Sequence, residues 1–257
     1  MTSDAVRVCI EAPRASITLS NPDRRNALSL ATMTGITAAL RSLSADPGAQ
    51  VIVIDAEGPA FSAGHDMSEM IDRPARFYDE LFAACAELMQ TIHDVPQPVV
   101  AKVDGIATAA GCQLVASCDL VVASDTSSFA TPGVRIGLFC STPMVPISRA
   151  VGRKRAMEML LTGEPITADT AADWGLVNRV VPRAELDAAV DDLVARITRF
   201  SRATIAVGKE AFHRQIDMSE PDAYDYTRTV MAANAADDNA QEGIGAFLDK
   251  RNPVWPS

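Results

Sequence analysis

Apolar runs of strand type alternate with segments of helical periodicity through the first half of this 257-residue chain. The β-branched run VIVIDA at 51–56 predicts a strand that is buried on both faces. Residues 76–94 carry apolar side chains at helical spacing, and strand-like 98–105, helical 110–117 and strand-like 119–124 follow. Because strands that alternate with helices pack as crossover units, this order predicts an α/β fold.

The second half of the chain has a different pattern. Beyond about residue 143 the segments are helical in character, and LVNRVV at 176–181 is the one convincing strand. We therefore expect a core over residues 1–199 and a helical carboxy-terminal region over residues 200–257. No low-complexity linker separates the two parts, so the helical region is expected to pack on its own core or on a neighbouring subunit.

The composition excludes several classes of function. Hydrophobic residues make up 48% of the chain and charged residues 22%, which is typical of a globular protein with a large core. The 23 Lys and Arg residues against 33 Asp and Glu residues give a net charge of −10, which disfavours nucleic acid and anionic membranes as partners. No apolar stretch predicts a membrane span or a secretory signal, so we expect a cytoplasmic protein without membrane insertion. The five cysteines have neither disulfide-framework nor zinc-site spacing, and no metal site is predicted.

Two loops with small residues lie where a predicted strand gives way to a helix. The first reads FSAGHDMSEM at 61–70, and the second reads DGIATAAGCQL at 104–114. Small residues allow a ligand to approach the backbone, and the N–H groups at a helix start have no partner within the helix. Two such loops could together hold one carbonyl oxygen. The alternative is that each is only a tight turn between a strand and a helix.

Five segments in order resemble the enoyl-CoA hydratase/isomerase, or crotonase, superfamily over nearly the whole chain. They are ITLSNPDRRNAL (17–28), PAFSAGHDMSEM (59–70), PVVAKVDGIATAAGCQLVASCDLVVAS (98–124), GLVNRVVP (175–182) and FLDKRNPVW (247–255). The resemblance implies a spiral of ββα turns followed by a helical carboxy-terminal region, assembled as homotrimers or dimers of trimers. It also implies an acyl-CoA thioester ligand, with coenzyme A entering as part of the substrate and no separate cofactor.

The resemblance assigns the thioester carbonyl to two backbone N–H groups, an arrangement called an oxyanion hole. The two donors fall at His65 and at Ala110. The family's usual G-G-G is here Ala109-Ala110-Gly111, and an alanine forced to positive φ would cost about 1 kcal/mol or more. We therefore expect ordinary φ angles at the two alanines.

The two glutamates that hydratases of this family use are both absent. Their positions are occupied by Gln113 and Gly133, and neither residue can transfer a proton near neutral pH. Each general acid or base contributes roughly 10²–10⁴-fold to rate, so efficient addition of water by the two-carboxylate mechanism is not expected.

Other chemistry on the same thioester remains open. His65 and the adjacent Asp66 could form an acid–base pair for isomerisation, decarboxylation or thioester hydrolysis. In the alternative reading, Asp66 only caps a helix that begins at Met67, and His65 contributes its N–H alone. Cys140 could be a nucleophile or a packed thiol. A non-catalytic acyl-CoA carrier or regulatory protein is a further alternative.

The remaining candidates concern binding of the CoA ester. Basic side chains at Arg24, Arg25 and Lys250 are candidates for the CoA phosphates, because Arg and Lys pair with phosphate oxygens. The substrate-contacting positions in the two loops are Ala63, Gly64, Met67, Ser68 and Gly111. The acyl chain is expected to meet the 67–85 segment, where Phe77, Tyr78 and Phe82 could line its pocket or fill the core.

Overall fold

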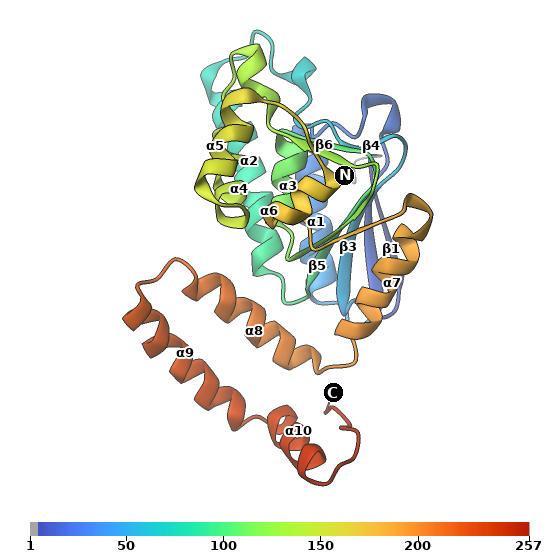
Figure 1. The fold of residues 1–257 in the computed structure, drawn as a ribbon, viewed down its shortest axis with the longest axis vertical. Coiled ribbons are helices and arrows are strands. Elements are labelled where there is room, and N and C mark those ends of the chain that lie inside the picture. Colours follow the sequence, from blue (N-terminus) through green and yellow to red (C-terminus); the bar gives the residue numbers. More distant parts are fainter. Residues whose placement is uncertain (1–4, 257) are drawn as a thin grey trace.

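Two β-sheets form the centre of the molecule in this computed structural model, which describes residues 5–256 (Figure 1). The larger sheet has the order β1-β2-β3-β5-β7-β10 and the smaller one the order β4-β6-β8-β9. The strands of the larger sheet are β1 Val6–Glu11, β2 Arg14–Leu19, β3 Val51–Ala56, β5 Val99–Val103, β7 Leu120–Ser124 and β10 Arg179–Val181. Those of the smaller sheet are β4 Ala60–Ser62, β6 Ile106–Thr108, β8 Ser128–Ala130 and β9 Ile166–Thr167. All neighbouring pairs are parallel except β1–β2 and β8–β9.

Helices pack around these sheets and continue beyond them. The α-helices are α1 Leu30–Ser44, α2 Ala75–Asp94, α3 Ala110–Ser117, α4 Met144–Ala150, α5 Arg153–Thr162, α6 Ala168–Trp174, α7 Leu186–Ile197, α8 Arg202–Gln215, α9 Glu220–Ala235 and α10 Asp238–Leu248. Short 3-10 turns are η1 Pro22–Arg24, η2 Met67–Glu69, η3 Pro132–Ile136 and η4 Arg183–Glu185. No helix in the described part of the chain is long and apolar enough to cross a membrane.

The chain repeats one unit as it winds through the two sheets. A strand of the larger sheet is followed by a short strand of the smaller sheet and then by a helix, as in β3-β4-α2 and β5-β6-α3. This is a spiral of ββα turns with a helical carboxy-terminal region, so the predicted fold class is confirmed. The short strands of the smaller sheet were not predicted, since two or three residues carry too little periodicity to be read.

The central strands are buried on both faces, as predicted for 51–56. Ile52 and Ile54 face the main core with α1 and α2, whereas Val51 and Val53 belong to a second cluster with α7. Alternation along one strand therefore serves two separate cores. The segments that follow β3 and β5 therefore begin at strands whose side chains are packed on both faces.

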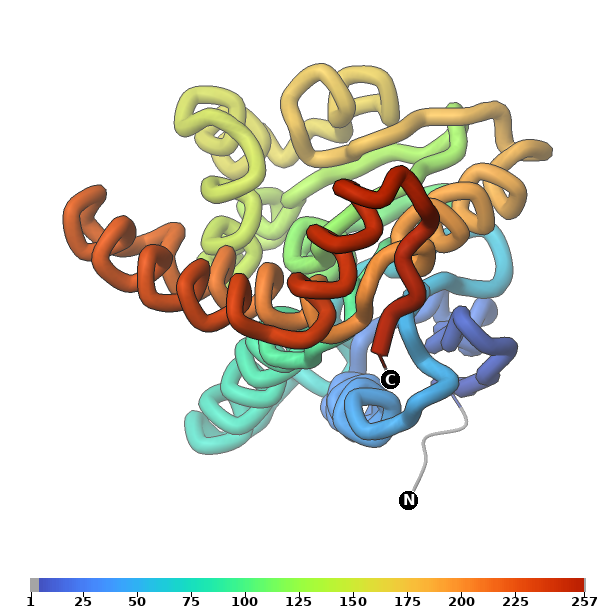
Figure 2. Tube along the Cα trace, turned by 90° about the horizontal axis from the view of Figure 1, so that it is seen from below, coloured from blue at the N-terminus to red at the C-terminus, as the bar shows by residue number. Residues whose placement is uncertain are grey.

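Helices α8, α9 and α10 extend away from the sheets, at the opposite end of the molecule from β4 and β6 (Figures 1 and 2). The expected boundary of the helical region, at residue 200, falls in the connection between α7 and α8. Partly buried polar contacts hold α8 to the core: Lys209 Nζ lies 2.7 Å from Asp119 Oδ2, and His213 Nε2 lies 3.0 Å from Asp119 Oδ1. The His213 ring also stacks on His93 of α2, with ring centroids 4.0 Å apart.

Candidate functional site

The first loop is fixed by backbone hydrogen bonds to the segment before α1. Ala63 N–H donates to Arg25 O at 3.0 Å, and Leu28 N–H donates to Gly64 O at 2.7 Å. Asp66 N–H donates to Leu28 O at 3.3 Å. The N–H group of His65, between these bonds, donates to no acceptor among the described residues.

Asn26 holds this arrangement together and was not among the residues that the sequence pointed to. Its side chain is buried, and its Nδ2 donates to Glu57 O and Ala60 O at 2.8 Å each. Its Oδ1 accepts from Asn21 N–H at 2.9 Å, and its carbonyl accepts from the Ser62 hydroxyl at 2.8 Å. Asn26 has φ 53°, a left-handed conformation that asparagine tolerates better than most residues. Its place in the NAL segment of the 17–28 motif was the available signal.

The second loop contradicts the expectation of ordinary backbone angles. Ala109 has φ 50° and ψ −118°, while Ala110 begins α3. The Ala109 N–H donates to Ala130 O at 2.9 Å, which fixes the peptide in this orientation. The neighbouring backbone therefore offsets a strain that we expected the chain to avoid. As the first helical residue of α3, Ala110 has an N–H with no acceptor among the described residues.

The two loops touch each other through glycines. A Cβ added to Gly64, which has φ +90°, would lie 2.9 Å from Ala109 Cβ and 3.2 Å from Ala110 N. A Cβ added to Gly111 would lie 2.4 Å from Ser62 O. Both contacts are possible only because glycine has no Cβ, so these glycines let the backbone of the first loop pack against the start of α3.

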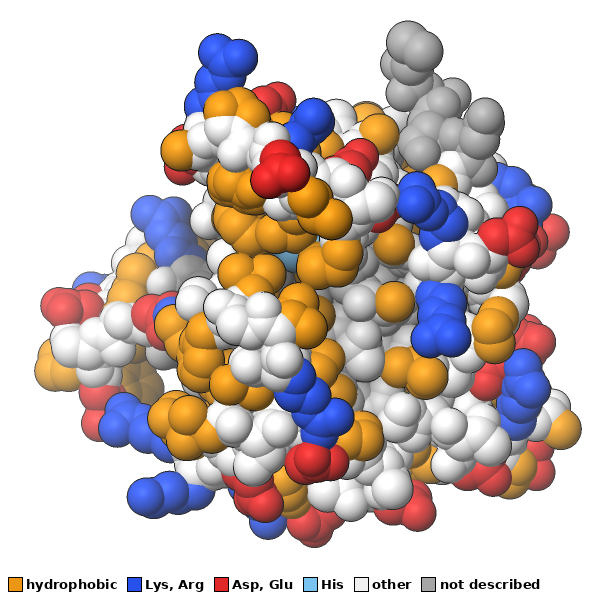
Figure 3. Space-filling view, turned by 90° about the horizontal axis from the view of Figure 1, so that it is seen from above, with side chains coloured by type: hydrophobic (Ala, Val, Ile, Leu, Met, Phe, Trp, Pro, Cys, Tyr) orange, Lys and Arg blue, Asp and Glu red, His pale blue; other side chains and the backbone are white. Residues whose placement is uncertain are grey.

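A cavity of about 410 Å³ opens at this place. Its lining comes from both loops, from α2 and from the segment after β8, and includes Ala63, His65, Met67, Phe82, Ala109, Ala110 and much of 132–143. Most of these side chains are apolar, and Figure 3 shows hydrophobic side chains gathered around a hollow at this end of the molecule. Of the three aromatic candidates for the acyl pocket, only Phe82 lines the cavity, whereas the Tyr78 hydroxyl donates to Met70 O.

His65 lines this cavity, but neither of its ring nitrogens is exposed to it. The residue is 9% exposed, and its ring meets Phe82 edge-on with centroids 5.4 Å apart. Neither ring nitrogen has a close hydrogen-bond partner in the described part of the chain. Burial lowers the pKa of His65 below its ordinary value and outweighs the opposite effect of a hydrogen bond with the Leu28 backbone, so the ring is neutral at pH 7. A buried polar group without a partner costs about 1–3 kcal/mol.

The predicted pair of His65 and Asp66 does not form. Asp66 accepts from the Arg24 guanidinium at 3.0 Å and from the Ser68 hydroxyl and N–H at 2.6 and 3.0 Å. Asp66 thus caps the short turn η2, and the alternative reading of this residue is the one observed. The capping bonds turn its carboxylate away from the imidazole.

The positions of the two absent glutamates differ in their surroundings. Gln113 is buried in α3, where its Oε1 accepts from the Cys85 thiol at 3.6 Å, and it does not line the cavity. Gly133 lines the cavity, but a Cβ on it would lie 2.0 Å from Leu138 O and 2.8 Å from Cys140 Sγ. The returning chain at 138–140 therefore fills the space that a side chain at 133 needs. Burial raises the pKa of the Cys140 thiol, so this sulfur stays protonated at neutral pH.

The candidates for the CoA phosphates are only partly brought together. Arg24 and Ser68 are joined by a hydrogen bond of 3.2 Å beside the first loop, and Arg25 is exposed next to them. Lys250 follows α10, and α10 lies at the opposite end of the molecule from β4 and β6 (Figure 1). Within one chain, Lys250 therefore does not belong to the same site.

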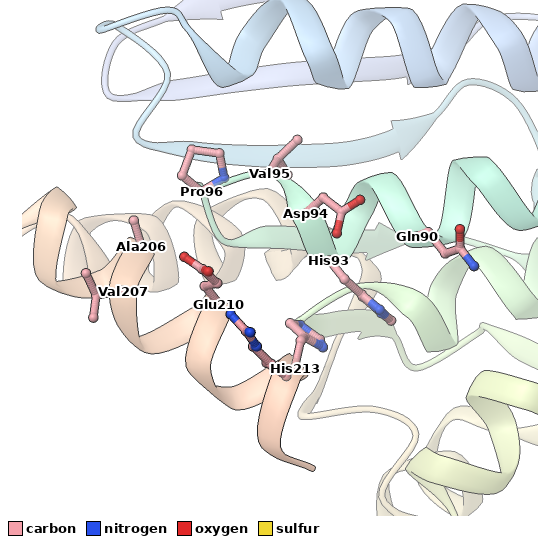
Figure 4. A pocket seen from close by; sticks show the side chains of 10 residues that line it. Gln90, His93, Asp94, Val95, Pro96, Ala206, Val207, Glu210 and His213 are labelled. Carbon is pink, nitrogen blue, oxygen red and sulfur yellow. The ribbon is translucent and has the colours of Figure 1, made fainter. Parts of the chain in front are cut away.

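A second cavity, of about 560 Å³, lies between the end of α2 and α8 (Figure 4). Its lining includes His93, Asp94, Glu210 and His213. Neither predicted loop reaches this cavity. Within residues 5–256 no group of three or more His, Cys, Asp or Glu side chains could hold a metal ion.

The spiral of ββα turns with a helical carboxy-terminal region defines a protein of the crotonase type. Residues 10–257 match the family model described as enoyl-CoA hydratase/isomerase, and the chain belongs to this family. It is 49% identical over 241 residues to mouse enoyl-CoA hydratase domain-containing protein 3, mitochondrial, covering 93% of this chain and 80% of the relative.

Two solved structures are similar over almost the whole chain. The crystal structure of an enoyl-CoA hydratase from Mycobacterium smegmatis is 45% identical with a TM-score of 0.96, covering 98% of this chain and 99% of that one. The crystal structure of human enoyl coenzyme A hydratase domain-containing protein 3 is 47% identical with a TM-score of 0.95, covering 98% and 100%.

The expectation of a cytoplasmic protein is contradicted by these comparisons. The similar mouse protein is named as mitochondrial. The expectation rested on the absence of a signal or membrane segment, and composition carries no information on which internal compartment a folded protein occupies.

Proposed function

We propose that the protein binds an acyl-CoA thioester and stabilises its enolate through the N–H groups of His65 and Ala110. The observation that carries this proposal is that both donors lack an internal acceptor and both residues line the same cavity. Ala110 also begins α3, so the helix dipole favours negative charge at its N–H. A fixed pair of donors stabilises a developing oxyanion by several kcal/mol.

The binding of acetoacetyl-CoA tests this proposal directly. This ester ionises to its enolate in solution without help from a protein, and the enolate absorbs in the ultraviolet. A protein with an oxyanion hole increases the absorbance of the enolate at fixed pH. Saturated butyryl-CoA, which gives no such absorbance, is the control. Binding without an increase in the band would contradict enolate stabilisation and would favour the carrier reading.

A proline at position 110 removes one donor selectively. Proline is tolerated at the first position of a helix, where Ala110 lies, and it has no N–H. We expect Ala110→Pro to lose most of the enolate band. Because the proline ring must fit beside Gly64, circular dichroism and the unfolding temperature are measured as well, to check that the variant is folded.

Efficient hydration of an enoyl-CoA is not part of this proposal. Gln113 cannot transfer a proton and does not line the cavity, and Gly133 has no side chain. Purified protein is expected to hydrate crotonyl-CoA at no more than a trace rate. A turnover comparable to that of ordinary hydratases, from protein free of host enzyme, would refute this part.

For the CoA phosphates we propose Arg25 together with Arg24. Arg25 has no ion pair among the described residues, whereas Arg24 is already paired with Asp66. Arg25→Ala is expected to weaken binding of butyryl-CoA in calorimetry but not binding of the phosphate-free ester butyryl-pantetheine. Equal weakening of both ligands would place Arg25 away from the phosphates.

We also propose that the protein is a homotrimer or a dimer of trimers. Large apolar side chains of the helical region are exposed in the single chain, with Met231 at 70%, Phe247 at 82% and Leu248 at 72%. Such exposure marks an interaction surface. Light scattering after gel filtration is expected to give a multiple of the 27.3 kDa chain, and a monomer would contradict the assembly.

A further inference from the structure

The hydroxyl of Ser62 joins two segments that support the first loop. Ser62 ends β4 and is completely buried. Its Oγ donates to Asn26 O at 2.8 Å and accepts from the Gly64 N–H at 3.2 Å. One buried oxygen therefore connects the segment before α1 to the glycine that precedes His65.

The direction of the His65 N–H depends on the peptide that it shares with the Gly64 carbonyl. A trans peptide is planar and points its C=O and its N–H in opposite directions, so the two groups turn together. The Leu28 N–H donates to the Gly64 carbonyl at 2.7 Å, which holds this peptide from one side. Gly64 has φ +90° and, as a glycine, could adopt many other backbone angles. The Ser62 hydroxyl restricts that freedom because it holds the Gly64 N–H.

Ser62 also packs against the start of α3. A Cβ added to Gly111 would lie 2.4 Å from Ser62 O, 2.7 Å from Ser62 Cβ and 2.9 Å from Ser62 Oγ, so the backbone and the side chain of Ser62 both lie against Gly111. Gly111 directly follows Ala110, and Gly64 directly precedes His65. Each of the two proposed donors is therefore next in the chain to a glycine that Ser62 contacts.

We propose that Ser62 is a positioning residue that fixes the His65 N–H relative to the Ala110 N–H. This proposal rests on the proposed function, because it concerns the two donors named there. Ser62 is not among the described residues that line the cavity, so it acts through Gly64 and Gly111 and not on the ligand. The donors of an oxyanion hole are effective only when they point at the position of the developing charge, and a misplacement of about 1 Å can cost about 100-fold in rate.

Titration of bound acetoacetyl-CoA tests this role. The absorbance of the enolate is measured against pH with the protein in excess, which gives the ionisation constant of the bound ester. Ser62→Ala removes one oxygen and both of its hydrogen bonds. We expect this ionisation constant to fall tenfold or more in Ser62→Ala, while the Kd of butyryl-CoA changes less than threefold. The two effects differ because hydrogen bonds to a charged oxygen are roughly twice as strong as those to a neutral one.

Ser201→Ala is the matched control. Ser201 is also buried, and its hydroxyl also donates once and accepts once, to Asn239 Oδ1 at 2.9 Å and from the Thr204 N–H at 3.2 Å. It precedes α8, which lies away from both loops. Both variants should lose a similar amount of stability in urea unfolding, but only Ser62→Ala should lower the ionisation constant. Ser62→Cys, which keeps a weaker donor at the same place, is expected to give an intermediate constant.

The outcomes separate this proposal from the proposed function. If the wild type increases the enolate absorbance but Ser62→Ala keeps the wild-type ionisation constant within twofold, Ser62 does not position the donors and enolate stabilisation stands. The same criterion applies to Ser62→Cys if the alanine variant does not fold. An equal fall in Ser201→Ala would assign the effect to lost stability and would also overturn the proposal. If the wild type gives no increase in enolate absorbance, the proposed function fails, and this proposal fails with it.

Discussion

Replacing Gly133 by alanine tests the reason that no glutamate can stand there. The added Cβ would lie 2.0 Å from Leu138 O, where ordinary contacts need at least about 3.0 Å, so the returning chain must move by about 1 Å. Gly133 does not have a positive φ, so an alanine has no conformational penalty and the effect is steric alone.

The magnitude follows from two terms. Forcing a methyl group into a packed site costs about 1–3 kcal/mol. The Leu138 N–H donates to Gly133 O at 3.0 Å in the same turn, and losing that bond costs about 1 kcal/mol. The sum is about 2–4 kcal/mol, which for a chain of this length lowers the unfolding temperature by roughly 4–16 °C.

The assay is thermal and urea unfolding of Gly133→Ala beside the parent at equal protein concentration. Gly208→Ala is the matched control, because Gly208 lies in the exposed middle of α8 with nothing within 4 Å of the added carbon. The control should gain about 0.5–1 kcal/mol from helix propensity. If Gly133→Ala stays within about 0.5 kcal/mol of the parent, the reasoning about the filled site is refuted.

Three further predictions follow from the site and its support. Asn26→Gly keeps the left-handed backbone but removes three side-chain hydrogen bonds, so urea unfolding should show a loss of about 3 kcal/mol. Ala109→Gly relieves a φ of 50° and should leave stability unchanged or raise it by up to about 1 kcal/mol, and a loss above 1 kcal/mol would show that the alanine is unstrained. The stability of the wild type should fall in two stages on acidification. Partial burial lowers the pKa of His93, so the unfolded chain binds a proton first and stability drops as the pH falls through about 6.5. Burial alone would raise the pKa of Asp119, but hydrogen bonds from His213 and Lys209 outweigh burial and lower it. The contribution of the Asp119 carboxylate to stability is therefore present above about pH 4 and is lost as the pH falls through the lowered pKa. Urea midpoints across pH should lose the first stage in His93→Gln and the second in Asp119→Asn.

Much of the fold could be predicted from the sequence, together with the two loops that line the candidate site. The strands at 51–56 and 119–124 and the helix at 76–94 have clear periodicity, and the structure has them within a few residues. The donors proposed at His65 and Ala110 were assigned from motifs because they are backbone groups, and this assignment stays a prediction. Their position depends on the course of the chain and not on side-chain identity.

What could not be predicted depends on contacts between distant segments. The strained φ of Ala109 follows from its bond to Ala130 O, and the filled space at Gly133 follows from the return of the chain at Leu138. The sequence allowed two roles for Asp66, and its hydrogen bonds to Arg24 and Ser68 show that it caps η2. None of these contacts has a signature in local sequence.

The two positions without the family's glutamates, 113 and 133, are not equivalent. Only at position 133 does the course of the backbone leave no space for a side chain. Glutamine and glutamate have nearly the same shape, so Gln113→Glu fits where Gln113 now meets Cys85. A carboxylate there would be buried with a thiol as its partner, and burial would raise its pKa and favour the neutral form. At position 133 the Leu138 carbonyl occupies the place of the first side-chain carbon, so Gly133→Glu requires the 138–140 segment to move. Restoring both glutamates therefore calls for a different course of that segment. The chain as it stands can support only chemistry that works without a carboxylate on this wall of the cavity.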